Sequence, residues 1–305
     1  MSAVRIVALP ESSEAARRLA VRLGVPIDLI EQHRFPDGEL RVRVGDVAPT
    51  MLIYASLDRP NDKLIALLFA CEALRRGGAQ RIVLIAPYLC YMRQDTAFRP
   101  GEAISQRVIG QLLGRAVDRV ITVDAHLHRT PEISAVFADI EAENLSAAPA
   151  MAAALSGSLA ADTIVVGPDA ESLPWVSNLA SRLGCDCAVA TKTRRDDRTV
   201  EVGFADPTQF VLRPVLLVDD IVSSGGTLIA CAKALRAAGA TYIDAVITHA
   251  LFPLGMLQAF SSAGIRTMRS TDSVAHPTNA IALDALFAEA LHNELVSPLA
   301  SGASR

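Results

Sequence analysis

The stretch that most constrains the fold runs from Val215 to Thr227. Four consecutive apolar residues predict a buried parallel strand, and two carboxylates, Asp219 and Asp220, stand at its carboxyl end. Small residues then lead into a helix that is expected to begin near Leu228. Because a strand that meets a helix through a short polar turn is typical of α/β proteins, the pattern predicts an α/β fold with a ligand-binding corner.

The residues of the turn favour an anionic ligand. They combine closely spaced N–H groups, two glycines without Cβ atoms, hydroxyl donors and the positive end of a helix dipole. These residues are Ser223, Ser224, Gly225, Gly226 and Thr227. Asp219 and Asp220 would repel a phosphate, so they suit the hydroxyls of an attached sugar or a cation. The corner is interpreted as a sugar-phosphate site, although so short a segment also occurs as a plain βα turn.

The sequence of residues 215–227 resembles the phosphoribosyl-diphosphate binding loop that type I phosphoribosyltransferases and ribose-phosphate diphosphokinases share. That resemblance, rather than the residues alone, implies that the sugar phosphate is ribose 5-phosphate. It assigns the sugar hydroxyls to Asp219 and Asp220 and the phosphate to Ser223–Thr227.

Composition excludes several other classes of protein. The chain has 305 residues, of which 51% are hydrophobic, enough for two domains with separate cores. The net charge of −4, without a block of Lys or Arg, does not favour nucleic acid as a partner. The long uncharged stretches 144–161 and 245–265 are interrupted by proline, so no membrane span is expected. Five cysteines without CxxC pairs and the lack of a signal peptide favour a reducing, cytoplasmic location.

An internal repeat supports a two-domain organisation. The residues Ala73-Leu74-Arg75, Gly78-Ala79 and Ile82 recur 161 residues later as Ala234-Leu235-Arg236, Gly239-Ala240 and Ile243. At the same offset Asp58 falls on Asp219, but the phosphate-binding turn has no counterpart in the first copy. The repeat therefore predicts two copies of one α/β domain, 1–145 and 146–305, each a mainly parallel sheet flanked by helices. The resemblance implies that both are phosphoribosyltransferase-like domains in tandem. A long amphipathic helix is expected over 280–295.

A tight turn in the first half is predicted by Phe35-Pro36-Asp37-Gly38-Glu39, with alternating apolar residues after it. On local grounds this is a simple hairpin. It also resembles the loop that ribose-phosphate diphosphokinases extend into the ATP site of a neighbouring subunit. The resemblance implies that Phe35, Asp37 and Glu39 bind ATP and that the protein is a homo-oligomer.

Two further segments follow predicted strands. Arg93, Gln94 and Asp95 form a polar loop that would lie at the carboxyl edge of a parallel sheet. The segment is either an ordinary loop or, by its resemblance to the ATP-binding segment of diphosphokinases, part of a nucleotide site. Asp124-Ala125-His126 matches the family's Asp-x-His pattern, which implies that His126 lies near Mg–ATP.

The second half carries two other candidates. Asp169 follows a strand and offers an oxygen ligand that suits Mg²⁺. The family usually places a glycine pair next, whereas this chain has Ala170-Glu171-Ser172-Leu173, so the approach of the backbone to the substrate stays open. Lys192 and Arg194 lie in a charged stretch that is either a solvated hairpin tip or, by resemblance, the mobile catalytic loop of diphosphokinases.

Together these segments predict a ribose-phosphate diphosphokinase that makes phosphoribosyl diphosphate and AMP from Mg–ATP and ribose 5-phosphate. In that prediction His126 and Asp169 hold the Mg²⁺ ion, and Lys192 and Arg194 are catalytic. Three alternatives remain at this point: a type I phosphoribosyltransferase, a non-catalytic regulatory homologue, and a relative that acts on another sugar phosphate.

Overall fold

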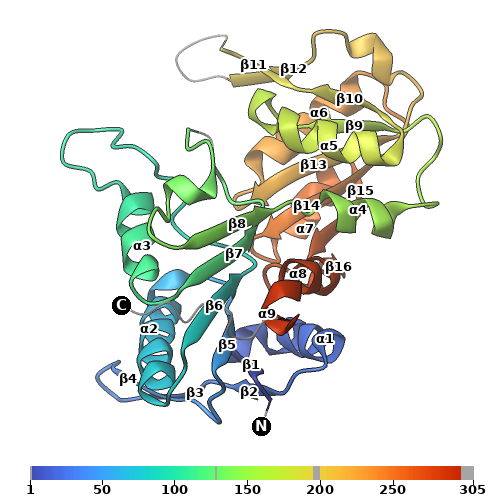
Figure 1. Ribbon diagram of the computed structural model, residues 1–305. Coiled ribbons are helices and arrows are strands. Elements are labelled where there is room, and N and C mark those ends of the chain that lie inside the picture. Colours follow the sequence, from blue (N-terminus) through green and yellow to red (C-terminus); the bar gives the residue numbers. More distant parts are fainter. Residues whose placement is uncertain (1, 128, 195–199, 297–305) are drawn as a thin grey trace. The chain divides into compact units, whose positions relative to one another are not determined.

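The computed structural model describes residues 2–127, 129–194 and 200–296 (Figure 1). The chain folds into two compact units. The first contains the residues up to Leu145 and the segment from Leu283 onward, and the second contains Ser146–Ala282.

The first unit is built around a parallel sheet of six strands in the order β2-β1-β5-β6-β7-β8. These strands are β1 (Val4–Ala8), β2 (Ile27–Leu29), β5 (Thr50–Tyr54), β6 (Arg81–Ala86), β7 (Arg119–Val123) and β8 (Glu141–Leu145). An antiparallel hairpin, β3 (Glu31–Arg34) and β4 (Leu40–Arg43), stands apart from the sheet. The helices are α1 (Ser13–Leu23), α2 (Pro60–Arg76), α3 (Ser105–Gly114), α8 (Asp284–Ala290) and α9 (His292–Val296).

Both faces of this sheet are covered. Leu67 of α2 and Leu113 of α3 belong to one apolar core with alternate sheet residues such as Ile53 and Leu84. The intervening sheet residues are also buried, and α1 packs against α8. The continuous apolar runs of the central strands therefore reflect burial on two sides, as is typical of parallel sheets.

The second unit repeats this plan. Its sheet has the order β10-β9-β13-β14-β15-β16. The strands are β9 (Ile164–Gly167), β10 (Asp186–Val189), β13 (Val215–Val222), β14 (Ile243–Ala250), β15 (Ile265–Thr271) and β16 (Asn279–Ile281), and β11 (Thr191–Arg194) and β12 (Val200–Gly203) form a separate hairpin. The helices are α4 (Ala148–Leu155), α5 (Leu173–Leu183), α6 (Gly226–Ala237) and α7 (Met256–Ala263). Within the described residues, no helix has both the length and the apolar character needed to cross a membrane.

The two units correspond element by element. In each, a strand, an eleven-residue helix that ends at a left-handed glycine and a hairpin follow in the same order. Those glycines, Gly24 and Gly184, are 160 residues apart, as are the starts of β3 and β11. The predicted fold class, two phosphoribosyltransferase-like domains with parallel sheets flanked by helices, is confirmed.

The carboxyl-terminal segment differs from its expected structure. Instead of one helix over 280–295, Asn279–Ile281 adds strand β16 to the second sheet, because Ile281 pairs with Thr271. The chain then returns to the first unit as α8 and α9, whereas the predicted second domain, 146–305, included these two helices. The polar contacts that hold it there involve Glu294 and Asp284, and sequence periodicity does not reveal such partners.

Candidate functional site

In the second unit, the order of the strands reverses between β9 and β13. The chain passes from β9 outward to β10 and then crosses to β13 on the other side of β9. In open α/β sheets, ligands bind at the carboxyl ends of strands where this reversal occurs. Asp169 follows β9, and Asp219 and Asp220 lie on β13, so three predicted ligand-binding carboxylates belong to the two strands at this reversal.

Asp219 and Asp220 lie inside β13 rather than after it, so the predicted end of the strand was wrong. β13 pairs with β9 through Leu217, whereas its pairing with β14 continues to Val222. The ladder to β14 thus extends the strand beyond its apolar run. The carboxylates are held on a rigid element and not on a loop.

The site carries an excess of negative charge. Burial raises the pKa of Asp219 well above its ordinary value, and the charges of Asp220 and Asp169 raise it further. Burial and the charges of Asp219 and Asp169 also raise the pKa of the Cys231 thiol to about 12. Hydroxyl groups that donate hydrogen bonds, or a cation, would stabilise the ionised carboxylates here.

The predicted phosphate-binding turn joins β13 to α6. Gly225 is the N-cap of α6 and has a φ of 73°, a left-handed conformation that favours glycine. Gly226 begins the helix, and the first N–H groups of any helix have no partner within it. Together with Ser223, Ser224 and Thr227, this turn has the conformation and the donors that an anion site requires.

The corresponding corner of the first unit has a different chemistry. The N-cap of α2 is Arg59, with a φ of 47°, in place of a glycine. The ammonium group of Lys63 donates to Ser56 O (2.9 Å) and to Asp58 Oδ1 (2.5 Å). A cation bound to the chain's own carboxylate replaces the phosphate-binding turn. Asp58 lies after the end of β5 at Tyr54, whereas Asp219 pairs with Ile247 inside β13, so these two residues are not equivalent in the ladders.

The segment that replaces the family's glycine pair is a tight turn. Asp169 is the N-cap of the 3-10 turn η3 (Ala170–Ser172), and the main-chain N–H and the hydroxyl of Ser172 both donate to Asp169 O, at 3.2 and 2.5 Å. A Cβ on Gly167 would lie 1.9 Å from Ser172 Oγ. The glycine at the end of β9 therefore accommodates the buried Ser172 side chain.

The predicted catalytic pair lies on the β11–β12 hairpin. The backbone of Lys192 pairs with Val202 and that of Arg194 pairs with Val200. These backbones are described, whereas residues 195–199 lie outside the described part of the chain.

The β3–β4 hairpin of the first unit carries Phe35, Asp37 and Glu39. Its turn is closed by the Phe35 N–H to Glu39 O bond (2.9 Å) and by the Glu39 N–H to Asp37 Oδ1 bond (3.2 Å). The Phe35 ring is 38% exposed and packs edge-on against His33. Arg34 binds Asp62 of α2 at 2.6 Å, which fixes the base of the hairpin. An exposed aromatic ring at the tip suits contact with another molecule.

The loops that follow β6 and β7 are tied together. Arg93 is exposed, while Gln94 Oε1 accepts a bond from Ser105 Oγ (2.7 Å). Asp95 accepts from both the main-chain N–H and the guanidinium of Arg129, and its side chain is 4% exposed. In this structure Asp95 therefore holds the loop after β7, and Arg93 is the exposed residue among the three predicted nucleotide ligands of the loop after β6.

The Asp124–His126 turn has a strained backbone. Asp124 is buried and has a φ of 39°, which is uncommon for a residue other than glycine. The neighbouring Ala125 N–H donates to the side chain of Asn144 on β8 (2.9 Å). His126, half-buried, is presented by this turn.

The sequence patterns did not single out three residues that support these loops. Asn144 orients the Asp124–His126 turn, Arg129 binds Asp95, and buried Gln106 accepts a bond from Thr130 Oγ1 (2.9 Å). Of these three residues, only Gln106 could have been found from the sequence, because it is a polar residue on the apolar face of a predicted helix.

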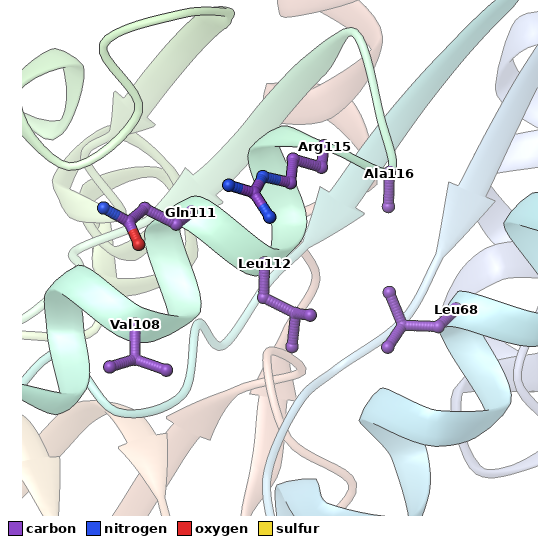
Figure 2. A pocket seen from close by; sticks show the side chains of 6 residues that line it. All are labelled: Leu68, Val108, Gln111, Leu112, Arg115 and Ala116. Atoms are coloured by element: carbon purple, nitrogen blue, oxygen red, sulfur yellow. The ribbon is translucent and has the colours of Figure 1, made fainter.

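A shallow pocket lies elsewhere on the first unit, between α2 and α3 (Figure 2). Figure 2 shows aliphatic side chains together with the longer polar chains of Gln111 and Arg115. Its lining residues are Leu68, Val108, Gln111, Leu112, Arg115 and Ala116, and none of them is a predicted site residue.

The described residues contain no group of three or more His, Cys, Asp or Glu side chains able to hold a metal ion. The carboxylates of the second unit nevertheless fit Mg²⁺, because this ion prefers oxygen donors, keeps several waters and binds substrate phosphates.

Comparisons with known proteins agree with this geometry. Residues 4–116 match the N-terminal domain of ribose phosphate pyrophosphokinase, and residues 141–272 match the phosphoribosyl transferase domain. A ribose-phosphate pyrophosphokinase of Methanopyrus kandleri is 33% identical over 293 residues, which cover 94% of this chain and 98% of the relative. The chain belongs to the ribose-phosphate pyrophosphokinase family.

Other members of the ribose-phosphate pyrophosphokinase family agree. Ribose-phosphate pyrophosphokinase 2 of Archaeoglobus fulgidus is 32% identical and covers 94% of this chain and 99% of its own. The crystal structure of phosphoribosylpyrophosphate synthetase from Mycobacterium smegmatis superposes with a TM-score of 0.82 at 26% identity, covering 95% of this chain and 98% of that one. Pyrophosphokinase and diphosphokinase name the same activity, so the predicted family and the enzyme class are confirmed.

Proposed function

We propose that this enzyme transfers the β,γ-diphosphoryl group of Mg–ATP to the 1-hydroxyl of ribose 5-phosphate. The 1-hydroxyl oxygen attacks the β-phosphorus, the bond from that phosphorus to the α,β-bridging oxygen breaks, and the hydroxyl proton is released. The products are phosphoribosyl diphosphate and AMP. The observation that carries the proposal is the β13–α6 corner, where the carboxylates of Asp219 and Asp220 stand next to a turn with a left-handed glycine and a helix N-terminus, in a chain of this family.

In this proposal each group at the corner has one task. The turn Ser223–Thr227 binds the 5-phosphate through hydroxyls and main-chain N–H groups. Asp219 and Asp220 accept hydrogen bonds from the 2- and 3-hydroxyls, which supports the ionised state that burial disfavours. Because both ends of the sugar are bound, the 1-hydroxyl is oriented for in-line attack.

Lys192 and Arg194 would neutralise the charge that develops on the phosphate oxygens, which is the main contribution of protein groups in phosphoryl transfer. Asp169 and His126 are the proposed protein ligands of Mg²⁺. When bound, Mg²⁺ supplies charge neutralisation on the phosphate oxygens of ATP.

The nucleotide is proposed to bind Arg93, Gln94, Asp95 and His126, together with Phe35, Asp37 and Glu39 from a neighbouring subunit of a homo-oligomer. The support is the exposed Phe35 at the tip of its hairpin and the linked loops after β6 and β7. These substrates and the free cysteines also favour a cytoplasmic enzyme.

Two alternatives are less well supported. A phosphoribosyltransferase would share the β13–α6 corner, but it would not account for the match of residues 4–116 to the pyrophosphokinase N-terminal domain. A regulatory homologue would not need Lys192 and Arg194, which this chain has.

The test is to incubate the purified protein with ATP, Mg²⁺ and ribose 5-phosphate and to follow the products by phosphorus NMR. AMP and a diphosphate on carbon 1 are expected, and neither should form when ribose 5-phosphate is omitted. Formation of ADP in place of AMP would refute the proposed transfer, because it would mean that a single phosphoryl group moves.

A further inference from the structure

Gly225 is in close contact with an aromatic ring. A Cβ built on this residue would lie 2.5 Å from Cε1 and 2.6 Å from Cζ of Phe260, which belongs to α7. The same construction on Gly226 meets nothing closer than Ser224 Oγ at 3.9 Å. The edge of the Phe260 ring therefore touches the phosphate-binding turn at the one residue that adopts the left-handed conformation.

The Phe260 ring cannot easily move away, because other rings hold it. Phe260 is 1% exposed, and its ring meets that of Phe252 edge-on at 5.0 Å. Phe252 in turn packs against the imidazole of His276 at 4.5 Å. The three rings form a column, Phe260–Phe252–His276, that ends at Gly225.

Hydrogen bonds fix the far end of the column. His276 Nε2 donates to Phe252 O (3.2 Å), since a carbonyl can only accept, and Nδ1 then accepts from Thr278 Oγ1 (2.7 Å). This arrangement needs a neutral imidazole, and burial lowers the pKa of His276, which favours that form. The same histidine therefore holds both the ring and the main chain of Phe252.

We propose that Phe260 is a positioning residue for the sugar phosphate: its ring holds Gly225 in the left-handed conformation and so directs the first N–H groups of α6 at the phosphate. This inference rests on the proposed function, which supplies the ligand. Phe260 acts through Gly225 and touches no substrate. A turn that is held in its binding conformation avoids the loss of conformational entropy on binding, so the column contributes to affinity rather than to the chemical step.

The test compares two matched substitutions, Phe260→Leu and Phe287→Leu. Phe287 is also fully buried and edge-on to an aromatic ring, but it belongs to α8 in the first unit. Each variant loses a ring and keeps an apolar side chain, so a comparable loss of thermal stability is expected. Calorimetric titration with ribose 5-phosphate should show a Kd raised on the order of 10-fold for Phe260→Leu, and within about twofold of the wild type for Phe287→Leu.

Turnover provides a second measurement. At saturating ribose 5-phosphate, Phe260→Leu should keep its kcat within about threefold of the wild type while its KM for the sugar rises, because no reacting group is removed. A double-mutant cycle with Gly225→Ala and Phe260→Ala tests whether Phe260 acts on binding through Gly225. Since a Cβ at position 225 meets Phe260, the losses of affinity should be clearly less than additive.

The outcomes separate the two proposals. The role of Phe260 is refuted if the wild type binds ribose 5-phosphate and the Kd of Phe260→Leu equals that of Phe287→Leu. It is also refuted if the double-mutant cycle is additive. In both cases the proposed function stands. If the wild type binds no ribose 5-phosphate, the proposed function fails, and the role of Phe260 fails with it.

Discussion

Removing the carboxylate of Glu294 should destabilise the first unit selectively. This side chain is 7% exposed, and it binds Arg81 through two bonds of 2.8 Å and Arg119 through one of 3.0 Å. Because Glu294 lies on α9 and the two arginines begin strands β6 and β7, these bonds fasten the returning carboxyl-terminal segment to the sheet of its own unit.

The magnitude follows from the partners that remain. Breaking a buried ion pair by removing one member costs about 3–5 kcal/mol, since the other charge is left buried and unpaired. Here Arg81 keeps Glu141, and Arg119 keeps Glu143, so the loss in Glu294→Ala should be lower, about 2 kcal/mol. For a domain of this size, that loss lowers Tm by about 4–8 °C.

Differential scanning calorimetry is the appropriate assay, because two units need not unfold in one transition. Glu289→Ala is the matched control, as Glu289 is exposed on the neighbouring helix α8. The control should change Tm by less than about 1 °C. Equal shifts for the two variants would refute the assigned role of Glu294.

The same carboxylate makes stability depend on pH. Burial alone would raise the pKa of Glu294, but hydrogen bonds and charge from Arg81 and Arg119 lower it below its ordinary value of 4.5. Its contribution is thus complete above that value and is lost as the pH falls through the lowered pKa of the folded state. Glu294→Ala should show a smaller loss of stability in acid than the wild type, and unfolding curves recorded across the acidic range would test this.

Three other predictions concern the site. Lys192→Ala should lower kcat on the order of 100-fold or more and leave the binding of ribose 5-phosphate nearly unchanged, and equal losses in both would contradict its catalytic role. Asn144→Ala leaves the buried Ala125 N–H without its acceptor, so the KM for ATP should rise on the order of 10-fold in steady-state assays, with the KM for the sugar unaffected. Asp219→Asn should raise Tm at neutral pH and abolish sugar binding. Burial and two neighbouring carboxylates raise the pKa of Asp219 in the folded state, so its ionisation destabilises the fold as the pH rises above the ordinary value of 3.8. A Tm that is lower in Asp219→Asn than in the wild type would contradict this destabilisation.

Local patterns predicted the elements with strong periodicity. The apolar runs of the central strands, the glycines that end helices, and the Asp-Gly turn at position 38 are all local signals, and the structure contains the corresponding elements. The end of β13 was misjudged because its last residues are held by pairing with β14, which no local pattern reports.

Contacts that are distant in sequence were not predictable in the same way. Glu294 and Arg81 are 213 residues apart, and Gly225 is separated from Phe260 by helix α6, strand β14 and two loops. A glycine signals that a side chain is not tolerated, but it does not say which neighbour prevents it. Similarly, Asn144 supports a candidate site only because β7 and β8 are adjacent.

The return of α8 and α9 to the first unit bears on how the protein is made. The strands of the amino-terminal sheet are synthesised early, yet the helix that packs against α1 and the carboxylate that binds Arg81 and Arg119 are synthesised only after the second unit. The second unit, by contrast, is continuous in sequence and can fold before α8 and α9 are synthesised. The first unit to emerge is thus the last to be completed, and a nascent chain stopped before Leu283 should hold a finished carboxyl-terminal unit beside an amino-terminal one that proteases still cleave.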